Sequence, residues 1–229
     1  MTTSRAGGFS LIELVFSLAI LTLLAGLIFP TAELYLRNRM TSDTRDEMKK
    51  LANAIYKYYE NVGAFPSALG DLETKPGGVS NWEGPYIRPE FQGDATNNDD
   101  YRYDGWRTAY VLISSSSTVR RVRSWGPNRT NDSGSSDDIN IDVDISPVLR
   151  EQTRLELEEI NIAIANYNST HLPGTPLSTT YATLLSTLQT GAYLPSGATA
   201  TTKYTSDGWS HTYLPGPAPV QEVTAQGAP

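Results

Sequence analysis

The sequence predicts an α+β protein: a long N-terminal helix packed on a small antiparallel sheet, followed by a second unit made of a helix and a hairpin. Three observations predict this fold. Residues 34–61 contain neither Gly nor Pro, and their apolar side chains recur at helical spacing. Residues 103–113 have the character of a strand, and residues 119–123 alternate well enough to be its hairpin partner. A second helix-and-hairpin pattern follows residue 146.

The first half of the long helix is predicted to span a membrane. Residues 9–29 form a mainly apolar run in which Glu13 is the only charged residue, and their number is about that needed to cross a bilayer. A carboxylate at membrane depth costs roughly 2.5–3.5 kcal/mol. We therefore expect Glu13 to pair with a positive charge, which a second copy of the chain supplies most readily. Pro30 follows the apolar run, where it removes one helical hydrogen bond.

The small residues Gly7 and Gly8 precede the apolar run, whereas an ordinary secretory signal is cut after it. Cleavage after Gly8 would release residues 1–8 as a leader. It would also give Phe9 a free amino group four residues before Glu13.

The rest of the chain divides into further segments. The membrane and spine helix covers residues 9–62 and ends at Gly63, a residue suited to a helix C-cap. A first head covers residues 63–146. A second head covers residues 147–229, with a helix that opens at Pro147 and runs to Tyr167. After Pro219 we expect an extended, mobile tail.

The second head repeats motifs of the first. Leu51–Tyr59 resembles Ile160–Asn168, and Gly84–Ile87 resembles Gly191–Leu194. Asp104-Gly105-Trp106 and Tyr110 recur as Asp207-Gly208-Trp209 and Tyr213. The separations of 109, 107 and 103 residues drift slowly, which favours a duplicated head over convergence of two short units.

The N-terminal motif Gly8-Phe9-Ser10-Leu11-Ile12-Glu13 resembles the signal of type IV pilins and type II secretion pseudopilins. In that family a prepilin peptidase cuts after the glycine and methylates the new terminal phenylalanine, which implies these roles for Gly8 and Phe9. The family's glutamate, here Glu13, meets the terminal amine of a neighbouring subunit. Pro30 falls where the family has a proline that loosens the helix.

The first head resembles that of the major pseudopilin of type II secretion. The resemblance rests on Phe65-Pro66, Trp82–Tyr86, Asp104–Arg107 and Ser124–Ile139, with Gly105 in place of a turn proline and Arg107 in place of a glycine. In that family the last segment holds calcium. The implied ligands are Asn128 and Asp138.

The chemistry of calcium, which takes six to eight oxygen ligands, adds Asp132 and Asp137 to this set. Asn128 stands where an aspartate is expected and Arg129 where a glycine is expected, so a solvated acidic turn is the alternative. A second acidic loop with Asp94, Asp99 and Asp100 could contribute further ligands.

Several classes of function are disfavoured. A net charge of −7 makes nucleic-acid binding unexpected, and the absence of cysteine excludes thiolate catalysis. The two histidines, His171 and His211, are not at metal-binding spacing with each other, and we expect neither to lie beside a convincing acid. No nucleophile elbow, phosphate loop or zinc-helix motif occurs, so we expect no enzyme.

The resemblance implies a pseudopilin-like structural subunit, held in the inner membrane with its heads in the periplasm and assembled into a filament that drives protein export. Expected partners are copies of itself, other pseudopilins or pilins, prepilin peptidase and an inner-membrane assembly platform. The alternative is a type IV surface pilin or minor pilin whose second head binds a ligand or substrate.

Overall fold

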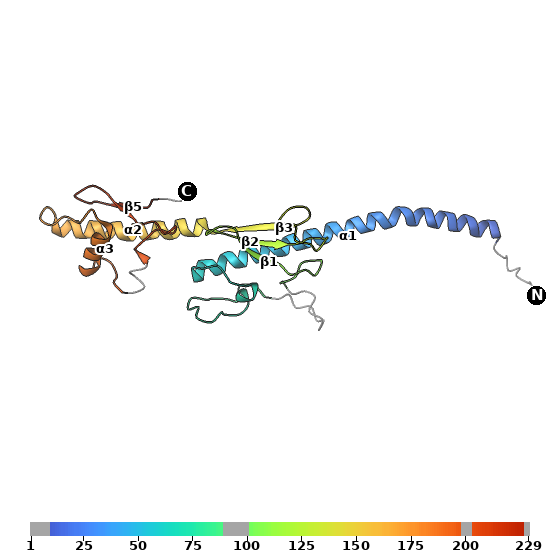
Figure 1. Cartoon of the computed structure of the whole chain (residues 1–229), viewed down its shortest axis with the longest axis horizontal. Helices are drawn as coiled ribbons and strands as arrows, with labels where there is room; N and C mark the ends of the chain where they lie inside the picture. Colours follow the sequence, from blue (N-terminus) through green and yellow to red (C-terminus); the bar gives the residue numbers. More distant parts are fainter. Residues whose placement is uncertain (1–9, 89–100, 198–202, 227–229) are drawn as a thin grey trace, which may run out of the picture. The chain divides into compact units, whose positions relative to one another are not determined.

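The computed structural model describes residues 10–88, 101–197 and 203–226 (Figure 1). The chain divides into two compact units: residues 1–115 with 120–143, and residues 116–119 with 144–229. Helix α1 (Leu11–Val62) belongs to the first unit. It ends at Gly63, whose φ of 76° suits glycine and whose N–H donates to the carbonyl of Tyr59. The expected long helix is therefore confirmed within these residues.

The second half of α1 forms one wall of the first core. Met48, Leu51, Ile55 and Tyr58 follow one another at three- and four-residue steps, and all are at most 3% exposed. They pack in one cluster with residues of η1 (Leu69–Leu72) and of the sheet. The sheet has the order β1 (Val111–Ser114), β2 (Val119–Ser124), β3 (Ile139–Asp144). β1 and β2 are antiparallel, with Val111 opposite Arg123, as the hairpin pattern predicts.

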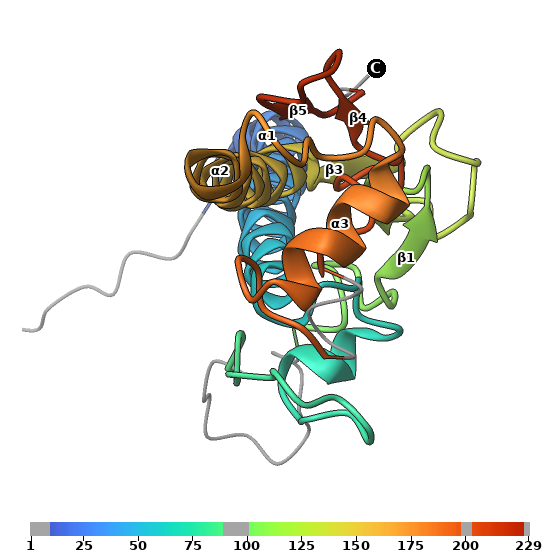
Figure 2. The ribbon, with the colours of Figure 1, turned by 90° about the vertical axis from the view of Figure 1, so that its left-hand side faces the viewer.

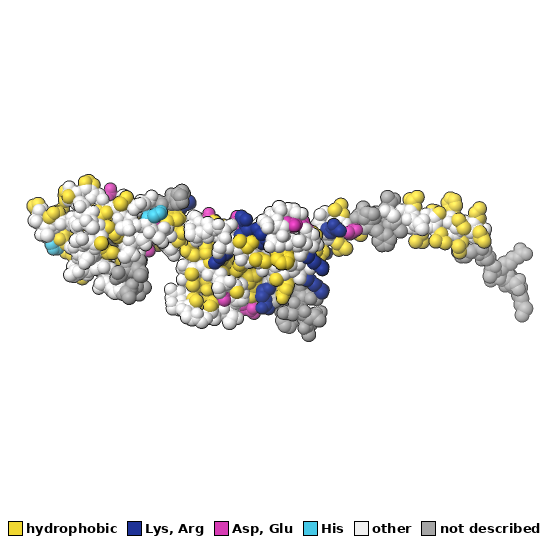
Figure 3. Space-filling model, viewed as in Figure 1, with side chains coloured by type: hydrophobic (Ala, Val, Ile, Leu, Met, Phe, Trp, Pro, Cys, Tyr) yellow, Lys and Arg dark blue, Asp and Glu magenta, His cyan; other side chains and the backbone are white. Residues whose placement is uncertain are grey.

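The first half of α1 has a different surface. Its large apolar side chains range from 49% exposed at Leu24 to 82% at Leu11, and Figure 3 shows them as a hydrophobic surface. Among the residues described, no helix is long and apolar enough to cross a membrane. The side chains of residues 25 and 27–31 lie outside the description.

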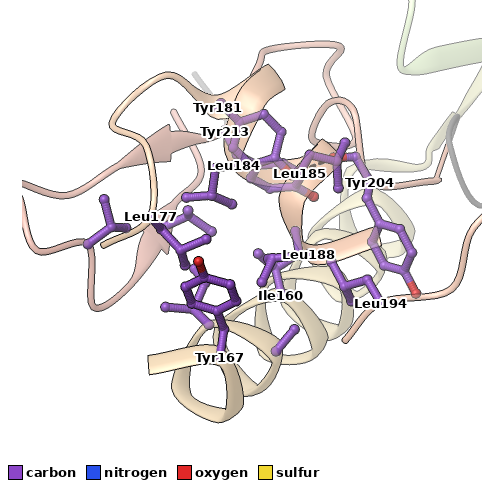
Figure 4. Close-up of a cluster of buried hydrophobic side chains, with 14 residues drawn as sticks. Ile160, Tyr167, Leu177, Tyr181, Leu184, Leu185, Leu188, Leu194, Tyr204 and Tyr213 are labelled. Carbon is purple, nitrogen blue, oxygen red and sulfur yellow. Dashed lines mark hydrogen bonds between the residues drawn. The ribbon is translucent and has the colours of Figure 1, made fainter. Parts of the chain in front are cut away.

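The second unit is built on α2 (Ser146–His171), which extends four residues beyond the predicted end. α3 (Tyr181–Thr190) lies beside α2 in the view of Figure 2, and β4 (Leu214–Pro215) pairs with β5 (Val223–Thr224). Figure 4 shows the core between these elements, in which Ile160 and Leu184 are fully buried and Tyr167 is nearly so.

The extended tail predicted after Pro219 is wrong as far as Gln226. Val220 and Val223 are at most 2% exposed and belong to the second core. The Asn161 side chain accepts a hydrogen bond from the Val223 N–H (2.8 Å) and donates one to its carbonyl (3.3 Å). The Asn168 amide donates to the Val220 carbonyl (2.8 Å). The final strand is therefore fastened to α2.

The same Asp-Gly-Trp turn occurs in both units. In the first, Asp104 Oδ1 accepts hydrogen bonds from the N–H groups of Trp106 (3.0 Å) and Thr108 (2.8 Å). In the second, Asp207 Oδ1 accepts from Trp209 (3.0 Å) and His211 (2.8 Å). Both aspartates are 4% exposed.

Each turn is attached to its helix by the same two bonds. A glycine N–H donates a hydrogen bond to a threonine hydroxyl, and a tyrosine hydroxyl donates one to a glutamate. The pairs are Gly105–Thr44 (3.1 Å) and Tyr110–Glu47 (2.8 Å) in the first unit, and Gly208–Thr153 (2.8 Å) and Tyr213–Glu156 (2.7 Å) in the second. Burial, and then the nearby glutamate, raises the pKa of both tyrosines, so they stay protonated donors at neutral pH.

The two turns differ at one oxygen. Ser124 donates to Asp104 Oδ2 (2.5 Å), whereas the buried Asp207 Oδ2 accepts no hydrogen bond from the described residues and has only His211 Nδ1 nearby, at 3.4 Å. The registers of the two hairpins explain the difference. Ser124 is one residue beyond the Arg123–Val111 pair, and Ala225 is one residue beyond the Thr224–Leu214 pair. The two residues are therefore at equivalent positions, and Ala225 lacks the hydroxyl that Ser124 donates to its aspartate.

Ala225→Ser should stabilise the second unit by about 1 kcal/mol, because the new hydroxyl can donate to Asp207 Oδ2. Native-state hydrogen exchange of the Trp209 and His211 amides measures the effect. The reciprocal change Ser124→Ala should weaken the first unit by about 1–3 kcal/mol. Faster exchange in Ala225→Ser would contradict the assignment.

Candidate functional site

Two places in the first unit carry the predicted site residues: the start of α1, and the loop of residues 125–138 between β2 and β3. Gly8 and Phe9 lie outside the described residues, as do Asp94, Asp99 and Asp100.

Glu13 lies in the first turn of α1 and is exposed. The positive end of the helix dipole favours a carboxylate there. Within residues 10–88, 101–197 and 203–226, no side chain forms an ion pair or hydrogen bond with this carboxylate. Pro30 lies inside α1, whose backbone stays helical through it.

The loop residues Asn128, Asp132, Asp137 and Asp138 are brought together by hydrogen bonds. Asp138 Oδ2 accepts from the N–H groups of Asp132 (3.1 Å) and Gly134 (2.7 Å). Asp137 Oδ2 accepts from the Asn128 N–H (2.8 Å). The Asn128 side chain donates to Asp132 Oδ2 (2.7 Å). Backbone amides thus order the loop around two adjacent carboxylates.

Two carboxylate oxygens of this loop remain unpaired. Asp137 Oδ1 and Asp138 Oδ1 are both buried and have no hydrogen-bond partner. Unpaired buried oxygens of this kind fit a cation that prefers oxygen ligands, such as calcium. In the described part of the chain, no group of three or more His, Cys, Asp or Glu side chains could hold a metal. Within the described residues, further ligands would therefore have to be neutral oxygens.

Arg123, on β2, contacts the loop and was not indicated by the sequence. Its side chain is 9% exposed, and Nε lies 4.0 Å from Asp138 Oδ2. Nε donates to Asn140 Oδ1 (2.8 Å) and Nη1 to Asn131 Oδ1 (3.4 Å). Val122, Arg123 and Ser124 are buried in succession, so strand alternation gives no signal for this position.

The expectation that neither histidine adjoins an acid is wrong for His211. Its Nδ1 lies 3.4 Å from Asp207 Oδ2. His171 instead stacks on Tyr167, with ring centroids 4.1 Å apart. Neither belongs to a metal-binding group within the described residues.

Comparison with known proteins covers the N-terminal part of the chain. Residues 35–142 match the family model of type II secretion system protein G, and residues 3–29 match the prokaryotic N-terminal methylation motif. Type II secretion system core protein G of Xanthomonas campestris pv. campestris is 36% identical over 118 residues. This alignment covers 48% of the chain and 80% of the relative. No solved structure matches.

Asp138→Asn should destabilise the first unit by about 2 kcal/mol or more, because its buried carboxylate accepts two backbone hydrogen bonds and faces Arg123. Urea denaturation of the full chain in detergent with EGTA measures the loss without metal. Asp142→Asn, at an exposed carboxylate on β3, is the matched control and should cost under about 1 kcal/mol. Equal losses in both variants would contradict a buried structural role for Asp138.

Proposed function

The chain belongs to the protein G family of the type II secretion system and is a pseudopilin, and we propose that it assembles through α1 into a filament that rises from the inner membrane and drives protein export. The family match also implies processing by prepilin peptidase and assembly with other pseudopilins. An inner-membrane assembly platform is the further partner in this proposal. The heads would lie in the periplasm before assembly.

One observation carries the proposal: the apolar start of α1 is not covered by any other described part of the chain. Each large apolar side chain from Leu11 to Leu24 is about half exposed or more. Such a surface is stable when it is removed from water. Lipid covers it before assembly and the helices of other subunits cover it afterwards.

Charge pairing between subunits then sets the register of the helices. Cleavage after Gly8 creates the α-amino group of Phe9, and Glu13 lies within the same apolar run without a partner in the described chain. The amine of one subunit offsets the desolvation of the carboxylate of the next. Pro30 relaxes the helix where it leaves this bundle.

The role is structural rather than catalytic. The protein G family supplies a filament subunit, and catalysis forms no part of this proposal. The match to protein G also favours a secretion pseudopilin over a surface or minor pilin whose second head binds a ligand.

Calcium is part of the proposal for the first head. Asp137 and Asp138 would hold the ion through their unpaired oxygens, and it would supply positive charge that joins β2 to β3 through the loop. Asn128 and Asp132, which are bonded to each other, would support the ligands.

The second unit is a duplicated head in this proposal. The repeated turn, with its threonine and glutamate contacts to the helix, supports common descent. The aromatic pairs agree: Tyr58–Tyr86 and Tyr167–Tyr193 both have ring centroids 5.5 Å apart in an edge-to-face arrangement. The proposed segments remain residues 1–8, 9–62, 63–146 and 147–229.

Glu13→Ala should leave cleavage and methylation intact but reduce filaments at least tenfold, because the terminal amine loses its carboxylate. Mass spectrometry of the N-terminus measures processing, and electron microscopy with quantification of the sheared fraction measures assembly. Ser17→Ala, one turn further along the same exposed face, should assemble normally. Normal filaments from Glu13→Ala would remove charge pairing from the mechanism.

Asp137→Asn should weaken calcium binding at least tenfold, since it removes the charge from one of the two proposed ligands. Calorimetric titration of the full chain in detergent with calcium chloride measures this. Asp142→Asn removes a carboxylate of β3 outside the loop and should bind as the unaltered chain does. Equal affinity in both variants would place calcium elsewhere.

A further inference from the structure

We infer that Arg123 is a built-in cation of the β2–β3 loop, which orders the loop without calcium and lowers its affinity for that ion. The affinity part of this inference rests on the proposed calcium site at Asp137 and Asp138. The ordering part rests on the contacts of Arg123 alone.

Arg123 projects into the loop. The guanidinium hydrogen-bonds the side chains of Asn131 within the loop and Asn140 on β3, and lies beside the fully buried Asp138 carboxylate. The chain closes around it at Gly134: a Cβ built there would lie 2.7 Å from Arg123 Nη2. Gly134 has a φ of 92°, so glycine is needed both for the backbone and for the close approach.

Arg121, two residues earlier on the same strand, provides the contrast. Its side chain is 31% exposed and pairs with Asp142 on β3 through bonds of 2.6 and 2.8 Å. The hydrogen bond from Arg121 holds the pKa of Asp142 below its usual range. This pair lies outside the loop and joins two strands at the surface.

The position of Arg123 opposes calcium in two ways. A guanidinium does not lose its proton in proteins, so a metal ion at Asp138 would sit beside a permanent positive charge. In addition, the amide oxygens of Asn131 and Asn140 are neutral ligands that calcium accepts, and both already bond the guanidinium.

The same contacts explain how the loop stays ordered without metal. A buried carboxylate needs hydrogen bonds and a compensating charge. Asp138 receives two backbone N–H groups, and Arg123 supplies the charge. The two unpaired oxygens are available to a metal ion, but the loop does not need that ion in order to stay folded.

The test compares the full chain in detergent with Arg123→Met and with Arg121→Met, which removes the same charge from the same strand. In EGTA, Arg123→Met should melt at least about 4 °C lower, and excess calcium chloride should restore most of the loss. Calorimetry should show at least tenfold tighter calcium binding by Arg123→Met. Arg121→Met should match the unaltered chain in both measurements.

Other outcomes separate the two claims. Unchanged melting of Arg123→Met in EGTA would overturn the ordering role, as would unfolding of the unaltered chain by EGTA. If the unaltered chain binds calcium as tightly as Arg123→Met does, the effect of Arg123 on affinity is overturned, while the calcium site remains in place. Absence of calcium binding in all three proteins would overturn the calcium site and the affinity claim together. If Arg123→Met does not fold, Arg123→Gln removes the charge, keeps a donor for Asn140 and carries the same expectation.

Discussion

The organisation of this protein depends on a helix whose first half is apolar and is not covered by the other described residues. The second half of the same helix buries Met48, Leu51 and Ile55 in a core, whereas Leu11 and Ile12 are more than 70% exposed. In the proposed assembly, this continuous helix joins a folded unit to a segment that lipids or other helices cover. Glu13, the single carboxylate of that segment, would then make the choice of neighbour specific.

The heads are held to their helices by a buried aspartate turn rather than by hydrophobic contact alone. Asp104 and Asp207 each gather two backbone N–H groups, and the glycine that follows each aspartate bonds a threonine of the helix. Because hydrogen bonds are directional, these bonds fix the position of the turn along the helix axis. Retention of the whole set in both units is hard to explain by general packing and is expected after duplication.

Local patterns in the sequence predicted α1, α2, the first hairpin and the repeated turn, since each depends on residues close together in the chain. They gave no indication of α3 or β3. They did not predict the buried end of the second unit, because Val223 is fixed by Asn161, 62 residues earlier. They also missed Arg123, since an arginine in a strand is ordinarily exposed and only the closing of the loop around it makes it buried. The family resemblance implied Asn128 and Asp138, and the chemistry of calcium added Asp132 and Asp137. The division of their oxygens into bonded and unpaired required the structure.

The two heads use different interactions to hold their hairpins in place. In the first, Ser124 links β2 to the aspartate turn, and the loop after β2 carries two buried carboxylate oxygens that have no hydrogen-bond partner among the described residues. In the second, Ala225 is at the position of the serine, and two asparagines of α2 hold the last described strand through backbone groups. The asparagine amides carry no net charge, so their hydrogen bonds to the strand need neither a metal ion nor an arginine to balance charge. Asn161 and Asn168 therefore hold the strand of the second unit by hydrogen bonds that involve neither a serine nor a charged loop.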